Sequence, residues 1–170
     1  SIAEKYKLFV VEDVAQAFGG MWKGKRLGSI ETVGAFSFFP SKNLGGFGDG
    51  GMISTNDVEI AELAGMLLKH GGKDKYNVDH IGYNARLDTI QAAILLKKLK
   101  HIDEFNKKRI EIAKAYNEGL SDLKGLIIPF KSASSDDNDF HHLYHQYTIR
   151  VLDGKRDDFQ RRLNEDAIST

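Results

Sequence analysis

One lysine, Lys42, stands at a position that favours a reactive amine. An apolar run over residues 33–39 reads as a strand and stops at Pro40, which has no N–H to give to a central ladder. Five glycines then fall within the seven residues 45–51, and glycine permits backbone turns that other residues avoid. Lys42 therefore lies between a predicted buried strand and a loop of unusual shape, where an amine could be held against a ligand.

An aspartate and a glutamine supply candidate partners for this amine. The run 8–11 is apolar on both faces, which is typical of a central parallel strand, and Asp13 follows it with Gln16 three residues further on. Ligands of open α/β sheets bind beyond the carboxyl ends of the strands, where Asp13 would lie. Taken alone, Asp13 fits a turn cap better than a functional group, and Gln16 fits an exposed helix position.

An amine near a carboxylate suits a carbonyl cofactor held as a Schiff base. The pKa of a free lysine is about 10.4, so desolvation or nearby positive charge must favour the neutral amine before it acts as a nucleophile. Pyridoxal phosphate is a carbonyl cofactor that also needs a carboxylate, because an aspartate paired with its ring nitrogen keeps that nitrogen protonated. Lys42 and Asp13 suit this chemistry without proving it.

Two phosphate-binding motifs resemble the glycine loop, and both fail. Gly46-x-Gly48-x-x-Gly51 has the spacing of the dinucleotide fingerprint, but that motif must open a helix, whereas residues 51–55 read as a strand. In a P-loop the lysine follows the glycines and directly precedes Ser or Thr, and Lys42 does neither.

Three histidines, His141, His142 and His145, suggest a metal cluster at first sight. Residues 144–152 predict a strand, however, along which His141 and His145 share a face but lie too far apart for a closed site. No carboxylate with matching spacing supports them, so we predict no metal.

The remaining periodicities predict the elements that position these residues. Asp88 with Gln91 three residues later indicates a capping box at the start of a long helix. Residues 132–139 read as an exposed loop. We expect strands at 8–11, 33–39, 51–55 and 144–152, a hairpin over 19–28 turning at Lys23-Gly24-Lys25, and helices from 57 to about 70, from 88 towards 119 and over 154–167.

Length and composition favour one domain or slightly more. The 170 residues are 41% hydrophobic, and 24 basic residues balance 24 acidic ones, so no net charge attracts nucleic acid or an anionic membrane. The chain has no cysteine, which excludes a disulfide scaffold, thiol catalysis and zinc–thiolate sites. No apolar run reaches the ~18–20 residues of a membrane helix. We expect a soluble cytoplasmic protein and, since no initiator Met is present, a fragment.

Three motifs follow one another along the chain. They are Glu12-Asp13-x-Ala15-Gln16-Ala17-x-Gly19, Ser37-Phe38-Phe39-Pro40-Ser41-Lys42-Asn43-Leu44-Gly45-Gly46-x-Gly48-Asp49-Gly50-Gly51, and Gly82-Tyr83-Asn84-x-Arg86-Leu87-Asp88-x-x-Gln91-Ala92-Ala93. Any one motif alone would be weak, but the three together in this order are specific. With them the chain resembles the DegT family of nucleotide-sugar aminotransferases from about residue 8 to residue 152.

The resemblance implies an α/β fold of the fold-type I pyridoxal phosphate enzymes. Residues 1–105 would form part of the large cofactor-binding domain, with a mixed or mostly parallel sheet. Residues 106–170 would form a linking helix and the start of a smaller α+β domain. Family members have about twice this length. Their N-terminal half supplies the main phosphate-binding turn and an aromatic that stacks on the cofactor, and neither is identifiable here.

The resemblance also implies a role for each matched residue. Lys42 would bind pyridoxal phosphate as a Schiff base and then move the proton as general base and acid. Asp13 would pair with the pyridine nitrogen, Gln16 would sit at the phenolic oxygen side of the ring, and Ser37 would bind the phosphate. Asn84 would reach the phosphate in the neighbouring subunit of a homodimer with shared active sites.

The resemblance also implies residues that contact the substrate. His145 resembles a family position near the sugar, and Tyr83 and Arg86 are further candidates in the third motif. The implied reaction moves an amino group, from glutamate in our interpretation, to a keto group of a nucleotide-linked hexose in surface-polysaccharide or deoxysugar biosynthesis. Alternatives are a non-catalytic or regulatory member, another fold-type I enzyme such as a lyase, and the sugar dehydratase branch, in which histidine replaces the lysine; Lys42 argues against that branch.

Overall fold

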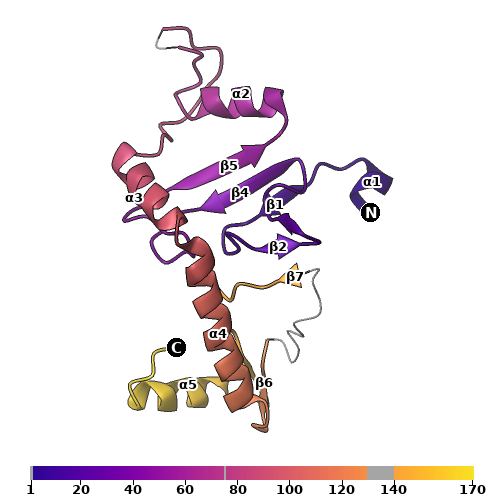
Figure 1. The fold of residues 1–170 in the computed structure, drawn as a ribbon, viewed down its shortest axis with the longest axis vertical. Helices are drawn as coiled ribbons and strands as arrows, with labels where there is room; N and C mark the ends of the chain where they lie inside the picture. The colour runs from indigo at the N-terminus through magenta and orange to yellow at the C-terminus, as the bar shows by residue number, and fades with distance from the viewer. Residues whose placement is uncertain (1, 75, 130–139) are drawn as a thin grey trace.

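A mixed three-stranded sheet carries the N-terminal part of the chain (Figure 1). Strand β4 (Val33–Ser37) lies in the middle, parallel to β1 (Val11–Asp13) and antiparallel to β5 (Gly51–Thr55). Because β1 and β4 are parallel, their carboxyl ends lie at the same edge of the sheet, and the segments that carry Asp13 and Lys42 leave from that edge. The computed structural model describes residues 2–74, 76–129 and 140–170.

The predicted strand at 8–11 is shifted in the structure. A short helix α1 (Ile2–Tyr6) precedes an extended segment, and β1 starts only at Val11. Within the described chain β1 is an edge strand, not a central one, and Phe9 is 87% exposed. The run 8–11 has the composition of a doubly covered strand, but in the described residues only β4 pairs with β1.

The hairpin expected over 19–28 is present. Strands β2 (Met21–Trp22) and β3 (Lys25–Arg26) pair across Lys23 and Gly24, both with positive φ, as a type I′ turn requires. Strand β7 (Phe140–His141) pairs with the other side of β2 and so brings the late segment of the chain against the hairpin. The strand expected at 33–39 ends at Ser37, and the one at 51–55 forms as predicted.

Helix α2 (Val58–Leu67) starts at the predicted cap. Asp57 Oδ1 accepts from the N–H groups of Glu59 and Ile60 at 2.9 and 3.1 Å. The helix ends three residues earlier than expected, because the chain turns sharply at His70, which has a φ of +65°.

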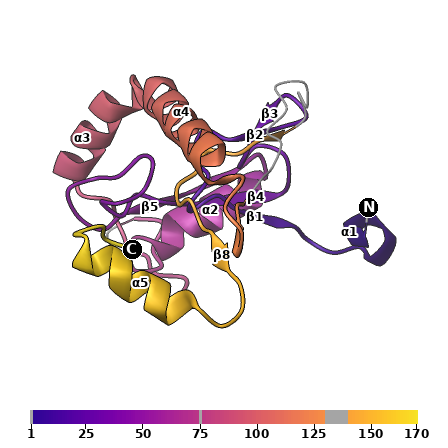
Figure 2. The ribbon, with the colours of Figure 1, turned by 90° about the horizontal axis from the view of Figure 1, so that it is seen from below.

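The long helix expected from 88 towards 119 is two helices. Helix α3 (Thr89–Leu99) and helix α4 (Ile102–Leu120) meet at a bend that both views show (Figure 1 and Figure 2). Leu95 of α3 and Ile102 of α4 pack into the same core, and the bend lets α4 then leave the sheet region. The capping box is also absent: Asp88 makes no side-chain cap bond, and Gln91 bonds the glycine loop instead.

Beyond α4 the chain forms a separate two-stranded sheet followed by a helix. Strand β6 (Leu126–Ile127) pairs with β8 (Arg150–Val151), and α5 (Arg156–Glu165) follows inside the predicted range 154–167. The strand expected over 144–152 is wrong except at β8, because Tyr144 adopts a left-handed φ of +47°. The loop predicted at 132–139 lies outside the described residues, and the domain boundary near residue 105 stays a prediction.

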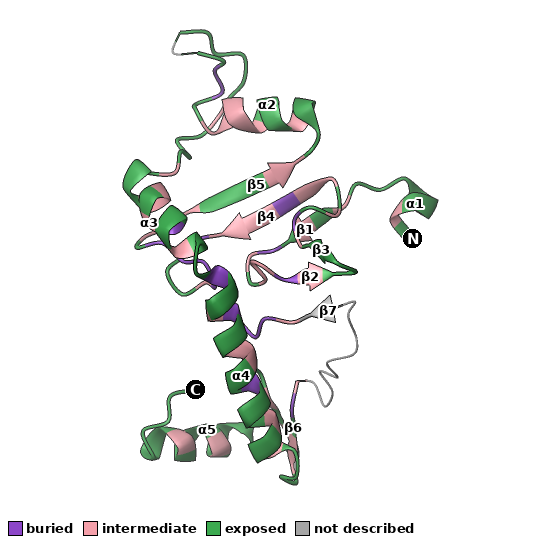
Figure 3. Cartoon of the chain, in the orientation of Figure 1, coloured by how far each residue is buried: buried purple, intermediate pink, exposed green. Residues whose placement is uncertain are grey.

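The core lies directly behind the Lys42 loop. Figure 3 shows buried residues gathered on β4, on the loop that follows it and on the inner side of α3 and α4. None of the helices in the described ranges is long and apolar enough to cross a membrane. The buried cluster consists of Phe38, Leu44, Leu95 and Ile102, flanked by Phe18, Phe36 and Leu87.

Candidate active site

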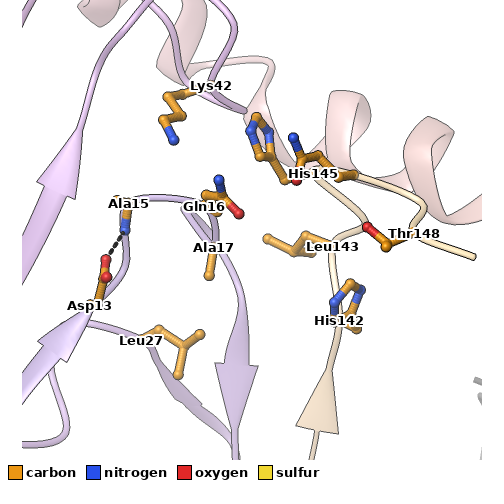
Figure 4. Close-up of a pocket in the computed structure, with 11 residues that line it drawn as sticks. Asp13, Ala15, Gln16, Ala17, Leu27, Lys42, His142, Leu143, His145 and Thr148 are labelled. Carbon is orange, nitrogen blue, oxygen red and sulfur yellow. Dashed lines mark hydrogen bonds between the residues drawn. The ribbon is translucent and has the colours of Figure 1, made fainter. Parts of the chain in front are cut away.

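A cavity of about 640 Å³ opens where the β1 end, the Lys42 loop and the 142–148 segment meet (Figure 4). Its lining is mostly polar or small, and the amine of Lys42 extends toward the segment that carries Ala15 and Gln16. The lining residues are Asp13, Ala15, Gln16, Ala17, Leu27, Lys42, His142, Leu143, His145, Gln146 and Thr148.

Asp13 is the last residue of β1 and is exposed to the cavity. Its Oδ1 accepts the N–H of Ala15 at 3.0 Å, which shapes the turn that also presents Gln16. The N–H of Val14 continues the ladder to the carbonyl of Ala35 on β4 at 2.8 Å, and Val14 itself is 1% exposed. Asp13 therefore directly precedes a residue that is anchored in the core, and its exposed carboxylate is held at the edge of the sheet.

The neighbouring carboxylate, Glu12, is a structural tether. Its two oxygens accept the N–H groups of Gly28, Ile30 and Glu31 at 2.6, 2.8 and 2.9 Å. Burial alone would raise the pKa of Glu12, but the three donors outweigh it, and the net result is a pKa below the usual value. Glu12 thus connects β1 to the loop that leads into β4.

We expect Glu12→Gln to destabilise the intact protein by about 1 kcal/mol at neutral pH, a reduced value because the group is part-exposed. Because the pKa of Glu12 is lower in the folded state than in the unfolded state, its carboxylate stabilises the fold at pH values above the unfolded pKa. This stabilisation disappears as the pH falls through the folded pKa. The deficit of the variant should therefore shrink in acid. Denaturant unfolding at several pH values measures it, with Glu62→Gln on exposed α2 as control; equal unfolding of Glu12→Gln and the wild type at neutral pH would contradict it.

Lys42 is held by the turn after β4. Its N–H donates to the carbonyl of Phe39 at 2.9 Å, and the N–H of Gly46 donates to Phe38 at 2.8 Å. Gly45 must be glycine, because a Cβ there would lie 2.3 Å from the carbonyl oxygen of Pro40. The loop thus closes back onto the end of its own strand, and Lys42 is half-buried.

Helix α3 fastens the same loop from behind. Gln91 Oε1 accepts the N–H of Phe47 at 2.8 Å, and Lys98 Nζ donates to the carbonyl of Gly45. Gly46, Gly48 and Gly51 run into β5 and open no helix, so rejection of the dinucleotide fingerprint is confirmed.

His145 lies on the segment across the cavity from Asp13, and its ring points towards Lys42 (Figure 4). Its Nδ1 lies 3.1 Å from Asn43 Oδ1. Burial lowers the pKa of His145, and the positive charges of Lys42 and Arg109 lower it further. His145 is therefore biased towards its neutral form.

Other predicted site residues lie outside this cavity. The hydroxyl of Ser37 accepts the N–H of Phe39 at 3.3 Å and does not line it. Tyr83, Asn84 and Arg86 are exposed and lie next to the end of α2, where Lys69 pairs with Asn84 in an isolated bridge. The chain therefore brings Asp13, Gln16, Lys42 and His145 together in one cavity, and Tyr83, Asn84 and Arg86 of the third motif do not line it.

Several residues of the site have no counterpart in the sequence-based prediction. Gln146 and Thr148 line the cavity, and Asn43 and Asn106 support it from behind. A signal existed for Asn106: it follows Ile102 by one helical turn, on the apolar face of α4, where a polar side chain is unusual.

Solved structures define the class of protein. DesV from Streptomyces venezuelae, in complex with a ketimine intermediate, superposes with a TM-score of 0.89 at 39% identity over 97% of this chain and 43% of that one. NtdA from Bacillus subtilis, with bound cofactor PMP, has a TM-score of 0.83 at 33% identity over 98% of this chain and 37% of that one. The predicted α/β fold of the pyridoxal phosphate aminotransferases is confirmed, and PMP in NtdA agrees with the predicted cofactor.

The DegT/DnrJ/EryC1/StrS aminotransferase family matches residues 1–170, and the chain belongs to it. Among curated relatives, a "Pleiotropic regulatory protein" of Geobacillus stearothermophilus is 44% identical over 100% of this chain and 44% of its own length. A dTDP-3-amino-3,4,6-trideoxy-alpha-D-glucose transaminase of Streptomyces venezuelae is 40% identical over 99% and 43%. The chain thus spans less than half the length of these relatives.

Proposed function

We propose that the whole protein is a pyridoxal phosphate-dependent aminotransferase acting on a keto group of a nucleotide-linked hexose. One observation carries the proposal: Lys42, Asp13 and Gln16, three residues with distinct predicted roles toward one cofactor, line one cavity. The transaminase names of relatives such as that of Streptomyces venezuelae support the substrate class.

The residues present fit the cofactor. Lys42 offers a primary amine for its aldehyde, Asp13 offers a carboxylate for its ring nitrogen, and Gln16 offers an amide for its phenolic side. A cavity of about 640 Å³ lies within the usual size of ligand pockets. Ser37, which does not line that cavity, is proposed to reach the phosphate from the end of β4.

Pyridoxal phosphate, when bound, supplies an electron sink for the pair left as a proton leaves the Cα of the amino donor. Lys42 Nζ would hold the cofactor, then take up that proton and return it at C4′ of the cofactor. Asp13 would keep the ring nitrogen protonated by its negative charge. Glu12 and Gln91 hold the two loops, so the amine and the carboxylate keep their separation.

The reaction is tested with the intact protein, glutamate and keto-sugar nucleotides. We expect amino-sugar product, a visible absorbance band from the lysine-bound cofactor, and borohydride trapping of that cofactor on Lys42. A label on another residue, or no chromophore with added pyridoxal phosphate, would overturn the proposal. Turnover also decides against the regulatory alternative, which the Geobacillus stearothermophilus relative raises by its name. A dehydrated product without an amine would indicate the dehydratase branch.

We further propose a homodimer with shared sites, in the cytoplasm, serving surface-polysaccharide or deoxysugar synthesis. The first part of the third motif, residues 82–86, supports the dimer, because Tyr83, Asn84 and Arg86 do not line the cavity of their own chain. Ile81 and Tyr83 are 98% and 69% exposed, which leaves this segment available to a second subunit. Asn84 would then complete the phosphate site of the partner, and Tyr83 and Arg86 would lie near its substrate.

Shared sites predict complementation between two inactive variants. Lys42→Ala and Asn84→Ala should each have little activity, but dimers reassembled from a mixture should recover about a quarter of wild-type turnover, since half of the dimers are mixed and each holds one intact site. Two Lys42→Ala preparations mixed with each other serve as control. A mixture no more active than its components would place Asn84 in the site of its own chain.

A further inference from the structure

A hydrogen-bonded chain of two buried amides joins the three segments that form the cavity. Asn106 Nδ2 donates to the carbonyl of Phe18 at 3.1 Å, and Asn43 Nδ2 donates to Asn106 Oδ1 at 2.9 Å. Asn43 Oδ1 then meets His145 Nδ1 at 3.1 Å. This series of hydrogen bonds therefore connects the turn after Asp13, the Lys42 loop and the 142–148 segment through α4.

The carbonyl of Phe18 fixes which group donates and which accepts in each of these hydrogen bonds. The carbonyl of Phe18 can only accept, so Asn106 must present its NH₂ group there and its oxygen to Asn43. Asn43 must then present its NH₂ group to Asn106 and its oxygen to His145. An amide oxygen can only accept, so the neutral ring of His145 must carry its proton on Nδ1.

Burial makes this polarity costly to reverse. Of the polar side chains in the described ranges, Asn43 and Asn106 are the buried ones, at 5% and 4% exposure. Turning either amide would set two oxygens or two NH₂ groups against each other out of reach of water. Gly19 makes room for the pair, because a Cβ there would lie 2.7 Å from Asn106 Nδ2.

A second histidine in the cavity has the opposite arrangement. His142 Nδ1 accepts the backbone N–H of Tyr144 at 3.0 Å, so its neutral ring carries the proton on Nε2. The two histidines of the cavity thus carry their protons on different ring nitrogens, and His142 serves as an internal reference for His145.

We propose that the Asn106–Asn43 amide pair sets the tautomer of His145, so that its Nε2 is offered to the cavity as a hydrogen-bond acceptor for a hydroxyl group of the substrate. Nε2 of His145 has no hydrogen-bond partner among the described residues. The cations Lys42 and Arg109 act on His145 and disfavour a cationic ligand group beside it, so a neutral hydroxyl is the partner of choice. The hydroxyl partner rests on the proposed function, whereas the tautomer does not.

The tautomer is tested by ring-nitrogen NMR of the intact protein labelled with ¹⁵N-histidine. Above the pKa of both rings, His145 should show a protonated Nδ1 and a bare Nε2, and His142 the reverse. Asn106→Leu should convert His145 into a mixture of tautomers and leave His142 unchanged. A wild-type His145 protonated on Nε2 would overturn the proposal.

Two further variants keep this test decisive. Asn43→Leu combined with Asn106→Leu removes both amides and leaves neither unpaired, so it covers the case in which Asn106→Leu fails to fold. The matched control is Asn117→Leu, also on α4, which loses the side-chain hydrogen bonds with Tyr147, whose hydroxyl donates at 2.6 Å, and with Tyr144, but leaves the Asn106–Asn43 pair intact. The control should keep the wild-type tautomer; an unchanged tautomer in the double variant as well would refute the amide pair as its cause.

The acceptor role has its own variant. In His145→Asn the new side-chain NH₂ can still donate to Asn43, but nothing replaces Nε2. We expect kcat/KM for the keto sugar to fall about 10–100-fold with the half-reaction of the amino donor unchanged. An unchanged kcat/KM would remove the acceptor role, while a wild-type protein without any turnover would defeat the proposed function and leave the NMR result standing.

Discussion

Lys42→Ala abolishes amino transfer by the whole protein, with an expected loss on the order of 10⁴-fold in kcat. The reason is that one Nζ performs two tasks, holding the cofactor and moving the proton, and the described cavity contains no second primary amine. The folded state should survive, because Lys42 is half-buried and the bonds that hold its loop are made by backbone atoms and by α3.

Turnover, borohydride trapping and thermal unfolding of Lys42→Ala are measured together. The matched control is Lys25→Ala, which removes an exposed lysine on β3 away from the cavity. The control should keep wild-type turnover and trapping. Turnover of Lys42→Ala within tenfold of wild type would show that another group moves the proton.

Asp13→Asn is expected to lower kcat by about 10³-fold with much less effect on cofactor binding. The substitution keeps the Oδ1 atom that accepts the N–H of Ala15 at 3.0 Å, so the turn after β1 should persist. What it removes is the negative charge that would keep the ring nitrogen of the cofactor protonated.

Single-turnover kinetics with each substrate distinguish the two effects for Asp13→Asn. Asp122→Asn, an exposed position after α4, is the control for loss of one carboxylate and should behave as wild type. A change confined to cofactor affinity, with kcat unaltered in saturating cofactor, would assign Asp13 a binding role only.

The local sequence determined much of the frame around the site. Pro40 and the glycines predicted a loop between strands at 33–39 and 51–55, because proline cannot donate to a ladder and glycine permits turns that other residues avoid. Strand β5 forms as predicted, and β4 ends earlier, at Ser37. The rule that ligands bind beyond parallel strand ends placed Asp13 and Lys42 at one edge, and the structure sets both in one cavity. The family motifs then carried the aminotransferase class, which the fold confirms.

Tertiary contacts overruled local signals at several positions. Asp88 and Gln91 have the spacing of a capping box, yet Gln91 bonds Phe47, 44 residues away. The apolar stripe continues through residues 88–119, yet the helix breaks before Ile102 because two helices pack on one core. The predicted strand 144–152 gives way to a left-handed Tyr144, which helps bring His145 beside Lys42.

The sequence by itself determined which chemical groups this protein carries and at which strand ends they stand, because strands, turns and caps depend on neighbouring residues. Only the tertiary structure decided how they act together. His145 meets Asn43, and Asn43 meets Asn106, across separations of 102 and 63 residues. Periodicity within a segment cannot predict such pairs, because the partner of a buried amide is chosen by the packing of α4 against both loops.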